Sequence, residues 1–119
     1  MQATMTCVGL DVHARSTHAA AIDVVSGELR RVRFGAGIEE VVSWLSGLSA
    51  PVRATYEAGP TGFGLARSAT AVGVEMLVAA PSKTPRAKGD RVKSDRKDAE
   101  LLARLLLAGQ LKPVVVPPA

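Results

Sequence analysis

Three apolar runs with short links open the chain and predict β-strands. Residues 6–12 are apolar except for one acid near the end, and residues 18–25 are rich in Ala, Ile and Val. Residues 28–34 carry a looser alternation of apolar and polar positions. Links of a few residues, such as Ser26-Gly27, join antiparallel neighbours. The pattern therefore predicts an antiparallel meander.

The hydrophobic period changes after the third run. Apolar residues recur at helical spacing from Ile38 to Leu48, which predicts an amphipathic helix. Residues 52–56 predict a strand that ends at Glu57, and residues 74–79 predict another. The chain thus changes from a meander to alternating strands and helices.

A second helix is expected between those two strands, over about 61–71. Pro60 suits the first position of such a helix. Gly62 and Gly64 weaken it locally, and we expect the backbone of another element to approach closely there. The helix should end at Gly73.

The last third of the chain contains a loop, a helix and a tail. Residues 81–91 are rich in Pro, Gly, Lys and Arg without periodicity, which predicts a loop. A strongly helical run follows, with Ser94 as the expected N-cap and Gly109 as the expected stop. Residues 111–118 predict a short extended tail.

The resulting order is strand-strand-strand-helix-strand-helix-strand-helix, which predicts an α/β fold. We expect a mixed five-stranded sheet with helices on both faces. Parallel crossovers would place the strand ending in Glu57 beside the strand that carries Asp11. This is the ribonuclease H-like arrangement, built as a single domain over residues 1–119.

Composition narrows the class of protein. With 119 residues, 47% of them hydrophobic and 22% charged, the chain fits one globular domain. The single cysteine, Cys7, excludes an internal disulfide and a cysteine-based zinc site. No apolar stretch is long enough for a membrane span, and the N-terminus lacks the pattern of a signal peptide. We therefore expect a cytoplasmic protein.

The positive charge is concentrated in one segment. Residues 83–97 contain two acids and seven basic residues, namely Lys83, Arg86, Lys88, Arg91, Lys93, Arg96 and Lys97. The excess there is larger than the net charge of +4 of the whole chain. Such a cluster suits a polyanionic partner, and a solvated loop is the simpler alternative. Lys88, Arg91, Lys93, Arg96 and Lys97 are candidate contacts to nucleic-acid phosphates.

Four acids are candidates for a metal site. Asp11 and Glu57 end two strands that the fold should bring together, and Asp95 and Asp98 share one face of the last helix. Leu102, Leu105 and Leu106 continue that face, so both acids should point inward. A buried carboxylate needs a partner: an Arg or Lys, a capping amide, or a metal ion.

A metal ion would explain all four acids together. Mg²⁺ prefers oxygen ligands, with Mn²⁺ as a substitute, and two such ions can hold the attacking and leaving oxygens of a phosphodiester. Each acid also has a simpler explanation, such as a helix cap or an ion pair. His13 and His18 flank the turn beside Asp11. His13 either supports the metal site or contacts a phosphate close to the metal, or it is an ordinary turn residue, and His18 is expected to be an ordinary turn residue.

Three strings carry a resemblance to a known family: Val8 to His13 (VGLDVH), Tyr56 to Gly62 (YEAGPTG) and Gly89 to Ala99 (GDRVKSDRKDA). They resemble the N-terminal domain of the insertion-sequence 110 transposases, the DEDD family related to the Piv and MooV invertases. That domain looks like the RuvC resolvase. The resemblance covers about residues 8 to 116.

The resemblance implies that Asp11, Glu57, Asp95 and Asp98 are the catalytic, Mg²⁺-binding DEDD acids. It implies a bacterial recombinase domain that acts on DNA phosphodiesters during DNA transposition, with a structured guide RNA. The basic loop would be residues 81–93 and the tail residues 111–119. Family members continue into a coiled coil and a second domain with a serine nucleophile, and no residue here matches that motif.

One alternative function stays open, and a second is disfavoured by the residues after the first acid. Without the C-terminal transposase domain, the chain could be a catalytically incomplete module that binds DNA or RNA, or an assembly domain left by truncation. A homo-oligomer would have to use a surface of this domain, and the apolar tail is one candidate. Sugar kinases and actin-like ATPases share the fold but need small residues after the first acid, where this chain has Val12 and His13.

Overall fold

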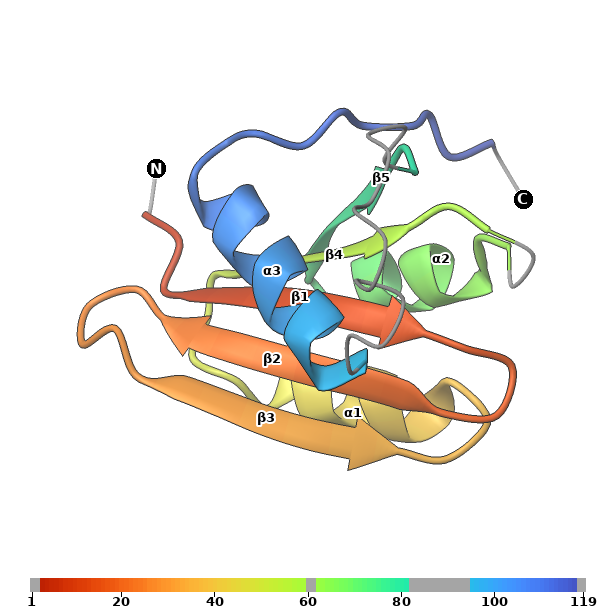
Figure 1. Ribbon diagram of the computed structural model, residues 1–119, viewed down its shortest axis with the longest axis horizontal. Helices are drawn as coiled ribbons and strands as arrows, with labels where there is room; N and C mark the ends of the chain where they lie inside the picture. Colours follow the sequence, from red (N-terminus) through yellow and green to blue (C-terminus); the bar gives the residue numbers. More distant parts are fainter. Residues whose placement is uncertain (1–2, 60–61, 82–94, 118–119) are drawn as a thin grey trace, which may run out of the picture.

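The computed structural model describes residues 3–59, 62–81 and 95–117, with the backbone alone for residues 95–97 (Figure 1). Five strands form one mixed sheet in the order β3-β2-β1-β4-β5. The elements along the chain are β1 (Thr6–Val12), β2 (Thr17–Asp23), β3 (Leu29–Phe34), α1 (Glu39–Ser46), β4 (Val52–Glu57), α2 (Gly64–Ala71), β5 (Glu75–Ala79) and α3 (Asp95–Leu107).

The pairing of the strands follows from the lengths of the links between them. The short links make β1, β2 and β3 an antiparallel meander. The helical crossovers through α1 and α2 make β4 parallel to β1, and β5 parallel to β4. The predicted α/β class and five-stranded mixed sheet are confirmed, and the architecture is consistent with a ribonuclease H-like fold.

Helices cover both faces of the sheet, as expected. The larger core lies under α1 and α2, where Val8, Leu10 and Tyr56 of the sheet pack with Val41 and Leu45 of α1. In Figure 1, α3 crosses the opposite face diagonally, in front of β1 and β2. The sheet is therefore the middle layer of three.

The face under α3 is lined by small side chains. Gly9 of β1 lies directly beneath the helix, and a Cβ atom placed on it would overlap the carbonyl oxygen of Ala99 and lie 2.5 Å from the backbone nitrogen of Ala103. Ala20 of β2, paired with Gly9, is also buried. These residues let α3 pack against the backbone of β1.

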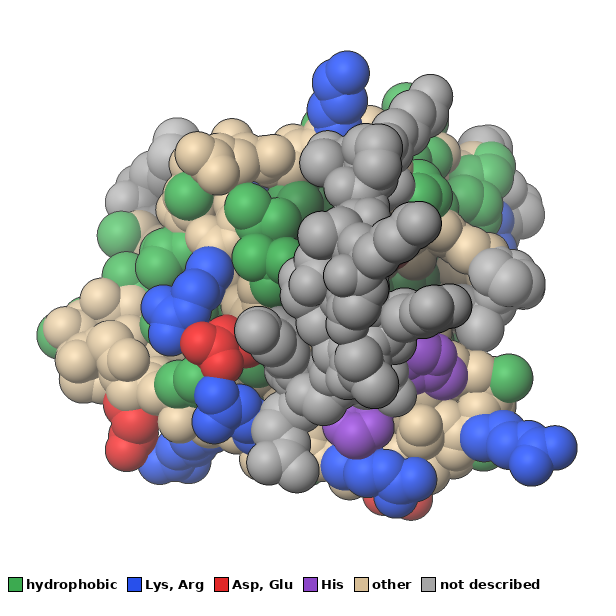
Figure 2. Space-filling view, viewed as in Figure 1, with side chains coloured by type: hydrophobic (Ala, Val, Ile, Leu, Met, Phe, Trp, Pro, Cys, Tyr) green, Lys and Arg blue, Asp and Glu red, His purple; other side chains and the backbone are tan. Residues whose placement is uncertain are grey.

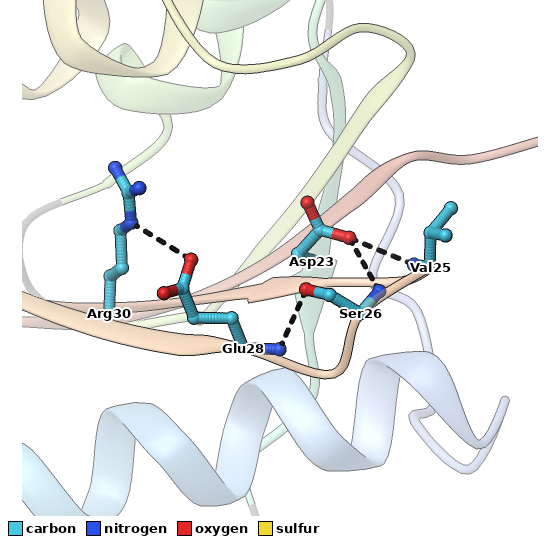
Figure 3. Close-up of polar contacts among 5 residues, drawn as sticks. All are labelled: Asp23, Val25, Ser26, Glu28 and Arg30. Atoms are coloured by element: carbon cyan, nitrogen blue, oxygen red, sulfur yellow. Dashed lines mark hydrogen bonds and ion pairs between the residues drawn. The ribbon is translucent and has the colours of Figure 1, made fainter.

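The turn between β2 and β3 is closed by side-chain oxygens (Figure 3). Asp23 Oδ1 accepts hydrogen bonds from the backbone N–H groups of Val25 and Ser26, each at 2.9 Å. The bond from Ser26 is the main reason that the pKa of Asp23 lies below its usual value. Gly27 adopts a φ of 78°, which favours glycine. The strand thus ends at Asp23, two residues before the predicted end.

The start of α2 differs from the prediction. The helix begins at Gly64, not near residue 61, because Gly62 has a φ of 78° that an α-helix cannot contain. The expected close approach at Gly62 and Gly64 is also not found among the described residues, since a Cβ atom at either would meet none of their atoms within 4 Å. Pro60, the expected first helical residue, lies outside the described residues.

The helix α3 is terminated at Gly109, as predicted. Gly109 has a φ of 70°, and its N–H donates to the carbonyl of Leu106 at 3.1 Å. The N–H of Gln110 donates to the carbonyl of Leu105 at 3.0 Å, which completes a Schellman motif. The expected N-cap, Ser94, lies outside the described residues.

The C-terminal tail pairs with the sheet of its own chain. The N–H of Val114 donates to the carbonyl of Val78 at 2.7 Å, and the N–H of Ala80 donates to the carbonyl of Lys112 at 2.8 Å. Val114 and Val116 pack against the core, whereas Val115 is 88% exposed. The predicted extended tail therefore lies along the edge of β5. No helix in the described ranges is both long and apolar enough to cross a membrane.

Candidate functional site

Asp11 and Glu57 lie at the ends of two neighbouring parallel strands. The register between β1 and β4 runs from Thr6 opposite Val52 to Leu10 opposite Tyr56. Asp11 and Glu57 are the next residue on each strand. The structure therefore confirms that the strand ending in Glu57 lies beside the strand that carries Asp11.

Both carboxylates belong to the face of the sheet that α3 covers. Leu10 and Tyr56 point into the core under α1 and α2. Because successive side chains of a strand point to opposite faces, Asp11 and Glu57 point toward the α3 side. The side chain of Asp11 is 17% exposed and Glu57 is exposed. The C-terminal ends of β1 and β4 are therefore acidic on this face, and the end of β4 is open to solvent.

Tyr56, the residue before Glu57, holds the backbone that follows Glu57. Tyr56 is buried, and its hydroxyl donates a hydrogen bond to the carbonyl oxygen of Gly62 at 3.0 Å. Burial raises the pKa of Tyr56, so the phenol stays a neutral donor. This bond ties the last part of the β4–α2 connection, next to the start of α2, to the end of β4.

The two remaining acids are on α3, whose N-terminal end lies toward the same side as the arrowheads of β1 and β4 (Figure 1). Asp98 is partly buried in the first turn, next to Ala99, which packs on Gly9. Asp95 is the first residue of the helix, and its side chain lies outside the description. Among the residues that should share their face, Leu102 and Leu106 are buried and Leu105 is only partly buried.

Asp11 has a histidine as its neighbour. Nε2 of His13 lies 3.0 Å from Oδ2 of Asp11, and the His13 side chain is 45% exposed. This contact places the imidazole ring beside the carboxylate of Asp11. Of the two interpretations of His13 offered by the sequence, a group beside the acid site fits this geometry better than an ordinary turn residue does.

The described side chains alone do not assemble a metal-binding group. No three His, Cys, Asp or Glu side chains in the described part of the chain come close enough to share an ion. The side chain of Asp95 is not among the described side chains. The donors at this position are nonetheless carboxylate oxygens on adjoining elements, the ligand type that Mg²⁺ prefers. The residues present therefore fit a hard divalent cation in chemical type.

An ion-pair network anchors α3 over the sheet, and sequence reasoning missed it. Glu100 accepts hydrogen bonds from Arg104 of its own helix, at 3.0 Å, and from Arg31 of β3. The hydrogen bonds from these two guanidinium groups hold the pKa of Glu100 below its usual value, and the bond from Arg104 has the larger effect. Because Arg31 is on the edge strand β3, this network links α3 to that edge of the sheet.

The basic residues expected to bind nucleic acid fall mostly outside the described residues. Lys88, Arg91 and Lys93 lie in the segment 82–94, and Arg96 and Lys97 are in α3 without described side chains. Their contacts to phosphate stay a prediction.

An α/β domain of this architecture, with acids at the ends of two neighbouring parallel strands, is consistent with the broad class of ribonuclease H-like proteins. Comparison with known families makes the assignment specific. The family model of the DEDD transposases of IS110, described as a transposase, matches residues 8–119. The chain belongs to this family, as the three sequence strings indicated.

Two curated relatives support the assignment. The chain is 44% identical over 117 residues to the protein y4qE of Sinorhizobium fredii, which is named as a candidate transposase. It is 33% identical over 103 residues to the transposase for insertion sequence element IS1533 of Leptospira borgpetersenii. The matches cover 92% and 83% of this chain but 30% of each relative. No solved structure matches the chain.

Proposed function

We propose that this domain carries the divalent-cation site with which a DEDD transposase acts on DNA phosphodiesters during transposition. Asp11, Glu57, Asp95 and Asp98 are the proposed ligands, and Mg²⁺ is the proposed ion. The observation that carries the proposal is the register of β1 and β4. It sets Asp11 and Glu57 side by side on the face that α3 crosses.

The chain's own residues would perform two tasks. The acids on two strands and one helix would hold the ion from different directions, which one element could not do alone. His13 would keep the Asp11 carboxylate oriented through the 3.0 Å contact between Nε2 and Oδ2. When bound, the cation would supply Lewis-acid stabilisation of charge on the phosphodiester oxygens.

The proposal includes the nucleic-acid partners. Lys88, Arg91, Lys93, Arg96 and Lys97 would contact the phosphate backbone of the DNA. The family relationship supports a DNA substrate and, through the resemblance described above, a structured guide RNA. Since the chain spans 30% of the length of each relative, the complete reaction is proposed for the whole transposase, to which this domain would contribute the four acids.

Calorimetric titration with Mn²⁺ tests the proposal. Mn²⁺ stands in for Mg²⁺ and binds oxygen sites more tightly. We expect saturable binding that Asp11→Asn and Asp98→Asn each weaken at least tenfold. Asp23→Asn is the matched control, because Asp23 pairs with Thr6 at the opposite end of the sheet, and an amide oxygen can still accept its turn hydrogen bonds. Equal affinity in all three variants would contradict the proposal.

A second candidate function is a module that binds nucleic acid or assembles with other subunits without its own metal chemistry. It is favoured by one observation, that no three potential ligands gather among the described side chains. In that case the wild-type chain would bind DNA but give no saturable Mn²⁺ isotherm, with or without DNA present. The calorimetric titration therefore separates the two functions.

A further inference from the structure

A row of polar side chains crosses the sheet from the acid site to its edge. In the register, Asp11 of β1 pairs with His18 of β2, and His18 pairs with Arg33 of β3. Directly paired residues point to the same face. Asp11, His18 and Arg33 therefore lie side by side on the face that α3 covers, and Glu57 continues the row on β4.

The contacts of Arg31 confirm which face this is. Arg31 is two residues before Arg33 on β3, so both point the same way. Arg31 reaches Glu100 of α3 and is paired there. Arg30 points to the opposite face, where it lies 3.5 Å from Glu28 and borders a small polar cavity with Gly47 and Leu48. Two of the three arginines of β3 therefore have acidic partners.

Arg33 is the remaining arginine of this strand. It is exposed and makes no ion pair with any side chain in the described ranges. β3 is the outermost strand of the sheet, so the route from Arg33 toward solvent is open on one side. Figure 2 shows both histidines of the chain and several Lys or Arg side chains on this face, over the ends of β2 and β3.

We propose that Arg33, together with His18, forms a phosphate-binding track that leads a DNA strand across the edge of the sheet to the acid site. The inference rests on the proposed function and adds to it the side from which the strand enters. Carboxylates repel phosphates, so a strand that approaches Asp11 and Glu57 needs cations nearby. Arg33 supplies one on the same face, outside the basic segment of residues 83–97.

The spacing suits a nucleic-acid backbone. Neighbouring strands lie about 4.8 Å apart, so the backbone of Arg33 is roughly 10 Å from that of Asp11. A DNA strand whose reactive phosphate lies at the acids would therefore carry an adjacent phosphate over β2 or β3. A guanidinium group binds phosphate with two parallel N–H donors, and even a neutral imidazole donates one N–H.

The test compares two charge-matched variants of one strand. Arg33→Gln removes the proposed contact, and Arg30→Gln removes an arginine from the opposite face of β3. Binding of the 119-residue chain to a fluorescently labelled DNA duplex is followed by anisotropy across a series of salt concentrations. EDTA is present throughout, so binding does not depend on a cation in the acid site. Thermal unfolding checks that each variant is folded.

We expect Arg33→Gln to weaken binding roughly two- to fivefold, the range for one solvent-exposed charge pair. It should also reduce the slope of log affinity against log salt by about 0.9, the value for one phosphate contact on a duplex. Arg33→Lys should restore the slope, since a lysine still neutralises a phosphate, and Arg30→Gln should match the wild type.

Equal losses in Arg33→Gln and Arg30→Gln, no loss in either, or no DNA binding by the wild-type chain would overturn the inference. None of these results bears on the proposed metal site, which is tested by Mn²⁺ titration and not by DNA binding in EDTA.

Discussion

Gly9 of β1 and Ala99 of α3 are in direct backbone contact, although they lie at opposite ends of the sequence. A Cβ atom on Gly9 would overlap the carbonyl oxygen of Ala99. Ala99 follows Asp98 directly and is one helical turn beyond Asp95. The absence of a side chain at Gly9 therefore sets how closely the backbone of α3 approaches β1 near Ala99.

Gly9→Ala should destabilise the fold by about 2–3 kcal/mol, because the clash is with backbone atoms that cannot rotate away. Denaturant unfolding measures the change. Gly35→Ala is the matched control: a Cβ atom there meets nothing within 4 Å, so its effect should stay within about 1 kcal/mol of the wild type, with added stability the expected sign. Similar stability of both variants would show that α3 does not rest on Gly9.

The Glu100 network should make stability depend on pH. Its arginine partners lower the pKa of Glu100 from the ordinary value of 4.5. A group with a lowered pKa in the folded state stabilises the fold above its unfolded pKa. That contribution is lost as the pH falls through 4.5 toward the folded pKa. Glu100→Gln should therefore flatten the fall in unfolding free energy on acidification.

Denaturant unfolding at a series of pH values measures this effect, and Arg31→Gln should flatten the curve in the same direction by a smaller amount. Asp23 also has a lowered pKa, so some acid sensitivity should remain in both variants. A Glu100→Gln curve that runs parallel to the wild-type curve would show that the network does not hold α3.

The tail should contribute to stability through alternate residues. Val114 is partly buried against the core and its N–H is bonded to Val78, whereas Val115 is 88% exposed. Val114→Ala should lower the unfolding free energy by about 1 kcal/mol, because it removes two partly buried methyl groups. Val115→Ala should be neutral within about 0.5 kcal/mol. If both variants behave alike, the tail does not pack on β5 in solution.

Much of the fold could be predicted because its signals are local. The apolar run of residues 6–12, the helical spacing from Ile38 and the glycine stop at Gly109 each depend on neighbours in sequence. The order of strands and helices then restricts the sheet, because helical crossovers give parallel neighbours. That is how Asp11 and Glu57 could be expected at adjoining strand ends before the structure was known.

The remaining features depend on contacts between distant segments. Gly9 looks like any glycine in a strand, and only the position of α3 explains it, whereas Gly62 serves a turn with positive φ instead of the expected close approach. Arg31 and Arg33 carried a usable signal, since the alternation in β3 places both on one face. Only the position of α3 shows that Arg31 pairs with Glu100, whereas Arg33 forms no ion pair with a described side chain.

The central claim is that the acids at the ends of β1 and β4 and at the start of α3 form one cation site. Paramagnetic broadening of backbone amide signals by substoichiometric Mn²⁺ tests it most directly, since the effect falls steeply with distance. We predict that the amide signals of Val12, Ala58 and Ala99 broaden first. The signals of Thr6 and Arg53, toward the other ends of the two strands, should broaden last. Asp11→Asn should remove this pattern. Broadening centred on the turn after Asp23, or uniform across the sheet, would contradict the central claim.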